Sequence, residues 1–146
     1  GLKGKIPWEI PEDLRKFQRL TLGHPVIMGE NTFCSILDRN GKPLAKRKNI
    51  VLSDTGLVYD GVCIAHSVQE AIAFCNNQDA YVIGGGRVYS EFLKLTSTLE
   101  LTRIHKYIDG DVFFPRVNWE DWRLVNIDEH RDASPFPYSF LTYKRG

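Results

Sequence analysis

The sequence lacks the cysteine pattern of a disulfide framework. Its three cysteines, Cys34, Cys63 and Cys75, are odd in number and form no CxxC pair, which indicates a reducing compartment. No apolar run approaches the roughly 18 residues that a membrane helix requires, and residues 1–8 do not have the pattern of a signal peptide. We therefore expect a cytoplasmic protein whose cysteines act as small hydrophobic residues.

The chain also lacks an excess of charge of either sign. Its 19 Lys and Arg residues oppose 18 Asp and Glu residues, so no overall field favours nucleic acid or an anionic membrane. The local basic run at residues 42–48 is typical of a solvated loop. The 4 histidines have no HxH or HExxH spacing, so no metal site is expected. No serine lies in a G-x-S-x-G elbow, and chemistry carried by a bound cofactor is favoured instead.

What the sequence does contain is the pattern of one α/β domain spanning residues 1–146. Short apolar runs alternate with amphipathic segments, which predicts a mostly parallel central sheet, flanked by helices and closed by a C-terminal antiparallel hairpin. Helices are expected at about residues 11–22, 32–37, 67–75 and 88–93, a loop at 38–46, and strands at 25–29, 49–53, 62–65, 80–83, 99–104, 112–114, 122–127 and 138–143. Ser67 and Glu70 have the spacing of a capping box.

One carboxylate, that of Asp13, has an unusual position. Pro11 suits the first position of a helix, so Asp13 falls at about the third, where the helix dipole favours a negative charge. The spacing i, i+4, i+7 also places Asp13 on the same helix face as Phe17 and Leu20. The pattern is compatible with an acid that complements the dipole and with a functional acid facing an apolar cleft.

Two predicted strands end in glycine-containing turns. Gly84, Gly85 and Gly86 let a ligand approach the backbone closely, although a plain tight turn would also explain them, and Arg87 adds a guanidinium suited to a diphosphate. The turn at residues 28–32 ends in Thr32, which can cap a helix or bind a phosphate. Neither turn has the GxGxxG or P-loop pattern. Together they predict one extended ligand across the carboxyl ends of parallel strands.

Several motifs resemble those of dihydrofolate reductases in their order and spacing. They are Ile6-Pro7-Trp8 with Asp13 and Phe17, residues 25–29 with Thr32 and Ser35-Ile36, Arg47 before residues 49–53, residues 82–89, residues 101–104, Gly110-Asp111 with Phe114-Pro115, and Trp122. The resemblance covers roughly the whole chain. It implies reduction of 7,8-dihydrofolate to tetrahydrofolate, with a hydride from NADPH and a proton added to the pterin.

The resemblance also implies roles for individual residues. Asp13 would orient the pterin and promote its protonation, with Trp8 ordering a water nearby, and Arg47 would bind the glutamate-tail carboxylate. The substrate would contact Asp13, Phe17, Ser35, Ile36, Leu44, Arg47 and Thr102. The dinucleotide would contact Gly29, Glu30, Asn31, Thr32, Leu52, Ser53, His66, Ile83, Gly84, Gly85, Gly86, Arg87, Val88 and Tyr89.

Glu30 departs from the family pattern, which usually has Arg or Lys after Met-Gly to meet the adenosine 2′-phosphate. A carboxylate repels that phosphate and suits a ribose 2′-hydroxyl, so NADH is expected as a donor besides NADPH, with His66 as a cation that could compensate. The segment at residues 37–42 is also longer than the family's usual turn.

Family members begin with a central strand and a loop that would lie before Gly1, about fifteen residues at the usual rise of a strand; with that strand present, a monomer is expected. A riboflavin-pathway type reductase of the same fold is an alternative, but Trp8, Asp13 and Phe17 favour a pterin. A catalytically silent dinucleotide-binding protein is another, although such a protein would not need Asp13, Thr102 and Arg47. The expected partners are dihydrofolate and a dinucleotide, without nucleic acid or membrane.

Overall fold

The structure, a computed structural model, describes residues 11–104, 119–130 and 138–145. The predictions for Trp8 and for a strand at residues 112–114 concern residues outside these ranges. Two compact units are present, one formed by Ile10–Leu93 and the other containing the chain from Lys94 onward. Within the described ranges, every helix is too short or too polar to cross a membrane.

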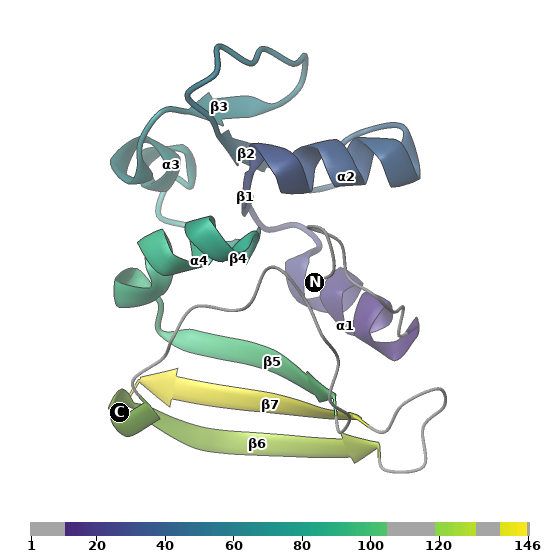
Figure 1. Cartoon of the computed structure of the whole chain (residues 1–146), viewed down its shortest axis with the longest axis vertical. Coiled ribbons are helices and arrows are strands. Elements are labelled where there is room, and N and C mark those ends of the chain that lie inside the picture. The colour runs from purple at the N-terminus through teal and green to yellow at the C-terminus, as the bar shows by residue number, and fades with distance from the viewer. Residues whose placement is uncertain (1–10, 105–118, 131–137, 146) are drawn as a thin grey trace. The chain divides into compact units, whose positions relative to one another are not determined.

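The first unit is a parallel four-stranded sheet with helices on both faces (Figure 1). Its elements are α1 (Pro11–Thr21), β1 (Val26–Gly29), α2 (Glu30–Asn40), β2 (Asn49–Leu52), β3 (Cys63–Ala65), α3 (Val68–Phe74), β4 (Tyr81–Gly84) and α4 (Gly86–Phe92). The strand order is β3-β2-β1-β4, and every pair is parallel. The parallel sheet expected from the sequence is confirmed.

The direction in which strands are added to this sheet reverses at β1. The chain adds β2 and then β3 on one side of β1, and it returns to place β4 on the other side. In open α/β sheets, ligands bind outside the carboxyl ends of the strands at such a reversal. The strands on either side of it end at Gly29 and Gly84, so both glycine-containing turns lie at the expected place.

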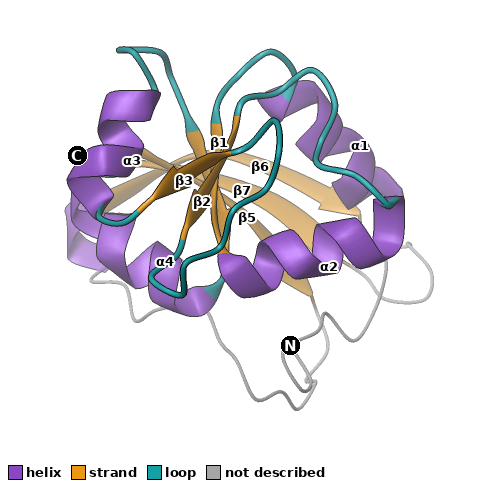
Figure 2. Ribbon diagram, turned by 90° about the horizontal axis from the view of Figure 1, so that it is seen from above, coloured by secondary structure: helices purple, strands orange, loops and turns teal. Residues whose placement is uncertain are grey.

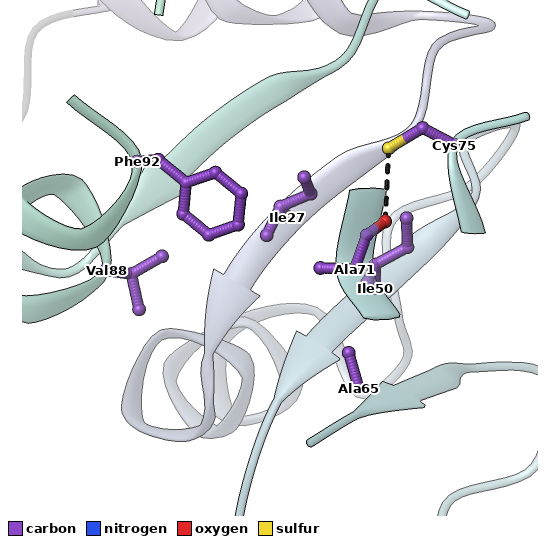
Figure 3. Packing of buried hydrophobic residues seen from close by; sticks show 7 residues of the cluster. All are labelled: Ile27, Ile50, Ala65, Ala71, Cys75, Val88 and Phe92. Carbon is purple, nitrogen blue, oxygen red and sulfur yellow. Dashed lines mark hydrogen bonds between the residues drawn. The ribbon is translucent and has the colours of Figure 1, made fainter. Parts of the chain in front are cut away.

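The sheet is buried on both faces because successive side chains of a strand point in opposite directions. Figure 2 shows α3 and α4 on one side of the sheet and α1 and α2 on the other. One apolar cluster, drawn in Figure 3, contains Ile27, Ile50, Ala65, Ala71, Cys75, Val88 and Phe92. The other contains Val26, Met28, Phe33, Leu44 and Val51. Neighbours along β1 and β2 thus belong to opposite clusters, as the unbroken apolar runs predicted.

The helix predicted at residues 32–37 is longer in the structure, so the prediction of a loop from residue 38 was wrong. α2 continues to Asn40 and ends at Gly41, whose positive φ of 73° allows its N–H to donate to the Leu37 carbonyl at 2.7 Å. Gly29 is the N-cap of this helix, so Thr32 lies inside its first turn and is not the cap. The cap predicted for α3 is confirmed, since Ser67 Oγ accepts the Glu70 N–H at 3.1 Å.

The second unit is an antiparallel three-stranded sheet. It contains β5 (Thr98–Ile104), β6 (Trp122–His130) and β7 (Tyr138–Arg145) in the order β5-β7-β6. Short 3-10 turns at Leu93–Leu95 and Trp119–Asp121 precede β5 and β6. The C-terminal hairpin expected from the sequence is therefore confirmed, as the pair β6 and β7. Arg145 lies over the Trp122 ring, 4.4 Å from its centroid, and joins the ends of these two strands.

Candidate active site

The two glycine-containing turns lie against each other in the first unit. A Cβ placed on Gly29 would be 3.0 Å from Val88 Cγ2, and one on Gly84 would be 3.2 Å from Thr32 Oγ1. Gly84 also has a φ of +132°, which residues with a side chain rarely adopt. Close contact between the turns, and not a tight turn alone, therefore favours glycine at both positions.

The groups around this contact fit a dinucleotide. The Thr32 hydroxyl lies in the first turn of α2, where helix N–H groups are available to an anion. Tyr89 is half-buried, with its hydroxyl 3.7 Å from the position of a Cβ on Gly84. The Arg87 side chain is 88% exposed and lies 3.4 Å from Glu91. A hydroxyl, helix N–H groups and a guanidinium together suit a diphosphate.

A carboxylate occupies the neighbouring edge of the sheet, between the ends of β1 and β2. Glu30 Oε1 accepts hydrogen bonds from Thr55 Oγ1 at 2.6 Å and from Ser53 Oγ at 3.1 Å. Ser53 is buried at 8% exposure, whereas Thr55 is exposed. Both partners are neutral hydroxyl groups, so the negative charge of Glu30 is not neutralised by them.

The remaining residues expected to contact the dinucleotide follow the same edge. Leu52 is half-buried at the end of β2, and His66 follows β3 directly. His66 Nδ1 lies 3.2 Å from Glu70 Oε1, and both side chains are exposed. His66, the residue that was expected to compensate for Glu30, thus has a carboxylate of its own beside it.

Three of the residues expected to contact substrate belong to one apolar cluster. Leu44 is buried in it at 9% exposure, and Phe17 and Ile36 pack against it while remaining half-buried. Ser35, also expected at this site, is exposed and donates to the Asn31 carbonyl at 3.1 Å. The structure thus brings the apolar candidates together on the face of the sheet covered by α1 and α2.

Arg47 lies beside this cluster with part of its guanidinium enclosed. Its Nη2 donates to Gln18 Oε1, and its Cζ is 5.8 Å from the centroid of the Phe17 ring. Burial lowers the pKa of the Arg47 guanidinium from its usual value, but arginine stays protonated at neutral pH. Its Nε is buried without a hydrogen-bond partner among the described residues. A guanidinium held beside an apolar cluster suits binding of a carboxylate.

The two polar residues that the family resemblance places around the pterin are only partly described. Asp13 is the third residue of α1, which begins at Pro11 as expected, and Thr102 lies opposite Phe140 in the β5–β7 pair. The side chains of Asp13 and Thr102 are outside the described part of the structure, so their roles stay predictions.

The sequence predictions missed three residues at these sites. They are Gln18, the partner of Arg47, Thr55, the partner of Glu30, and Asn49, which binds the loop before β2. The first two pairs are separated by 29 and 25 residues, so no local spacing indicates them. For Asn49 a signal was present, because a polar residue begins an otherwise apolar buried strand.

The known proteins that this chain resembles belong to one family. A family model described as dihydrofolate reductase matches residues 1–145. The chain is 42% identical over 134 residues to the dihydrofolate reductase of Haemophilus influenzae, covering 91% of this chain and 81% of the relative. It is 33% identical over 149 residues to that of Bacillus subtilis, covering 99% and 86%.

A solved structure of the same family is also similar to this chain in its fold. Dihydrofolate reductase from Enterococcus faecalis, complexed with NADP(H) and RAB-propyl, matches with a TM-score of 0.88 and 30% identity. The match covers 100% of this chain and 88% of that chain.

Proposed function

Because the chain belongs to the dihydrofolate reductase family, we propose that it reduces 7,8-dihydrofolate to tetrahydrofolate with NADPH. The observation that carries the proposal is the contact between the Gly84 and Thr32 turns at the reversal of strand order. It brings the backbone of the glycine turn and the Thr32 hydroxyl to one place, which suits the diphosphate of the cofactor. The nicotinamide, when bound, supplies the hydride.

Asp13 is the acid of this reaction. Its carboxylate accepts hydrogen bonds from the amino and ring N–H groups of the pterin and favours protonation of the neighbouring ring nitrogen. Two features support this role: Asp13 is the third residue of α1, and the helical spacing gives it the same face as Phe17, which packs in the apolar cluster. Trp8 orders the water through which the proton arrives.

Phe17, Ile36 and Leu44 form the apolar wall for the substrate, and Arg47 binds the carboxylate of its glutamate tail. The half-buried Arg47 guanidinium beside the Phe17 ring supports this assignment, since arginine binds carboxylates in charge-assisted hydrogen bonds.

We also propose that the protein acts as a monomer in the cytoplasm. The three cysteines are free, which supports a reducing compartment. Light scattering on the purified protein measures its oligomeric state.

The decisive experiment compares the unaltered chain with Asp13→Asn. Mixing with dihydrofolate and NADPH should lower the absorbance of the reduced nicotinamide, and Asp13→Asn should slow this turnover by about 100-fold or more. Binding of NADPH, measured by fluorescence, should be unchanged. Absence of turnover by the folded, unaltered protein would refute the activity, and an equal loss of cofactor binding would refute the role of Asp13.

A further inference from the structure

The Glu30 carboxylate lies in the part of the proposed dinucleotide site that is closest to β2. The diphosphate position is at the contact between the β1 and β4 turns, and Glu30 is the first residue of α2, directly after β1. A dinucleotide is much longer than its diphosphate, so its nucleosides extend to either side of that position. A nucleoside that extends towards the end of β2 would lie beside Glu30, Ser53 and Thr55.

These three side chains suit a ribose with a free 2′-hydroxyl. The Glu30 oxygen already accepts from two hydroxyls, and a carboxylate oxygen pair has about four acceptor sites, so it can accept from one hydroxyl more. A phosphate on the same ribose would carry a charge of about −1.5 to −2 at neutral pH. It would lie beside a like charge, which costs binding free energy.

The charges around Glu30 do not reverse this preference. Asp54, next to Ser53, is exposed and adds a second carboxylate to the same strand end. His66 lies 3.2 Å from Glu70, and Arg87 lies 3.4 Å from Glu91. Both basic side chains expected at the proposed site are therefore accompanied by carboxylates of their own.

We propose that Glu30 sets the cofactor specificity of this chain, by accepting a hydrogen bond from a free ribose 2′-hydroxyl and by weakening the binding of a 2′-phosphate. NADH thereby becomes an effective hydride donor alongside NADPH. The inference rests on the proposed dinucleotide site and adds a specificity residue to it. Ser53 and Thr55 are positioning residues, because they hold the carboxylate.

The experiment measures dissociation constants of NADPH and NADH by quenching of protein fluorescence. The unaltered chain should bind the two within about tenfold of each other. Glu30→Gln should tighten NADPH about five- to tenfold, since one like charge is removed, and weaken NADH about two- to fivefold, since an acceptor is lost. Glu30→Arg should extend the shift towards NADPH.

The matched control is Asp38→Asn, which removes the same charge from the exposed last turn of α2. At 1.5 Å per residue it is about 12 Å from Glu30, beyond the Debye length at physiological salt. Both dissociation constants should change less than about twofold. An unchanged ratio of the NADPH and NADH dissociation constants in Glu30→Gln would overturn the inference. So would a preference for NADPH above about 100-fold in the unaltered chain.

Salt provides a test that needs no variant. Screening weakens repulsion between Glu30 and the 2′-phosphate, so added salt should strengthen NADPH binding relative to NADH. A relative loss of NADPH binding would show attraction by cations and overturn the inference. If the Glu30 variants change the dissociation constants as predicted but the protein does not turn over dihydrofolate, only the proposed activity is refuted. Turnover with an unchanged ratio in Glu30→Gln would refute only the inference.

Discussion

The side-chain amide of Asn49 binds both backbone polar groups of Leu44. Asn49 Oδ1 accepts the Leu44 N–H at 3.1 Å, and Asn49 Nδ2 donates to the Leu44 carbonyl at 2.9 Å. The same Nδ2 donates to the Arg47 carbonyl at 3.0 Å. One buried amide thus holds the loop that carries both an apolar wall residue and the guanidinium of the proposed substrate site.

Replacing Asn49 by alanine should lower the free energy of unfolding by about 2 to 4 kcal/mol, because three backbone groups lose their partner. Urea denaturation measures this value. Asn40→Ala, at the exposed end of α2, should change it by less than about 0.5 kcal/mol. A similar small effect in both variants would show that water replaces the Asn49 amide.

Arg47→Lys should raise the KM for dihydrofolate about 10- to 100-fold with little effect on kcat, because a bidentate contact in the ground state is lost. Steady-state kinetics should show no such effect with a dihydropterin that lacks the glutamate tail. Arg19→Lys, on the exposed side of α1, is the matched control. Equal effects on both substrates would place Arg47 outside the tail site.

Gly84→Ala should destabilise the protein by about 2 to 4 kcal/mol and weaken NADPH binding, since its φ of +132° and the 3.2 Å approach to Thr32 Oγ1 exclude a side chain. Gly56→Ala is the comparison, because Gly56 also has a positive φ, +81°, but open space around it. It should cost about 1 kcal/mol and leave binding intact. Thermal unfolding and a fluorescence titration distinguish the two.

The Cys75 thiol should make stability depend on alkaline pH. Burial raises the pKa of this thiol, and the charge of Lys48 opposes the shift more weakly. Above about pH 8.5 the unfolded chain loses the proton while the folded chain retains it. The free energy of unfolding should therefore fall as pH rises in this range, relative to that of Cys75→Ala.

Urea denaturation at a series of pH values measures this difference. Cys34→Ala, which removes an exposed thiol, should leave the pH dependence of the unaltered chain in place. If the free energy of unfolding falls equally with pH in the unaltered chain and in Cys75→Ala, the prediction is contradicted.

Local features allowed much of the fold to be predicted. The apolar run at residues 25–29 indicated a strand buried on both faces, and the spacing of Ser67 and Glu70 indicated the start of α3. The end of α2 was missed, although Gly41 was visible as a C-cap. An Asn-Gly pair is typical of a loop as well, because the same left-handed glycine serves both turns and helix ends.

The sequence by itself determined the residue types available for chemistry: an acid at the start of α1, two glycine-containing turns and one arginine before a buried strand. Only the tertiary structure decided which of them meet. It placed Thr32 beside Gly84, paired Gln18 with Arg47, and gave Glu30 two hydroxyl partners after β2. These contacts join residues far apart in the chain. Those of Thr32 and Glu30 arise because parallel strands bring their carboxyl ends to one edge of the sheet, whereas the Gln18–Arg47 pair joins α1 to the loop before β2.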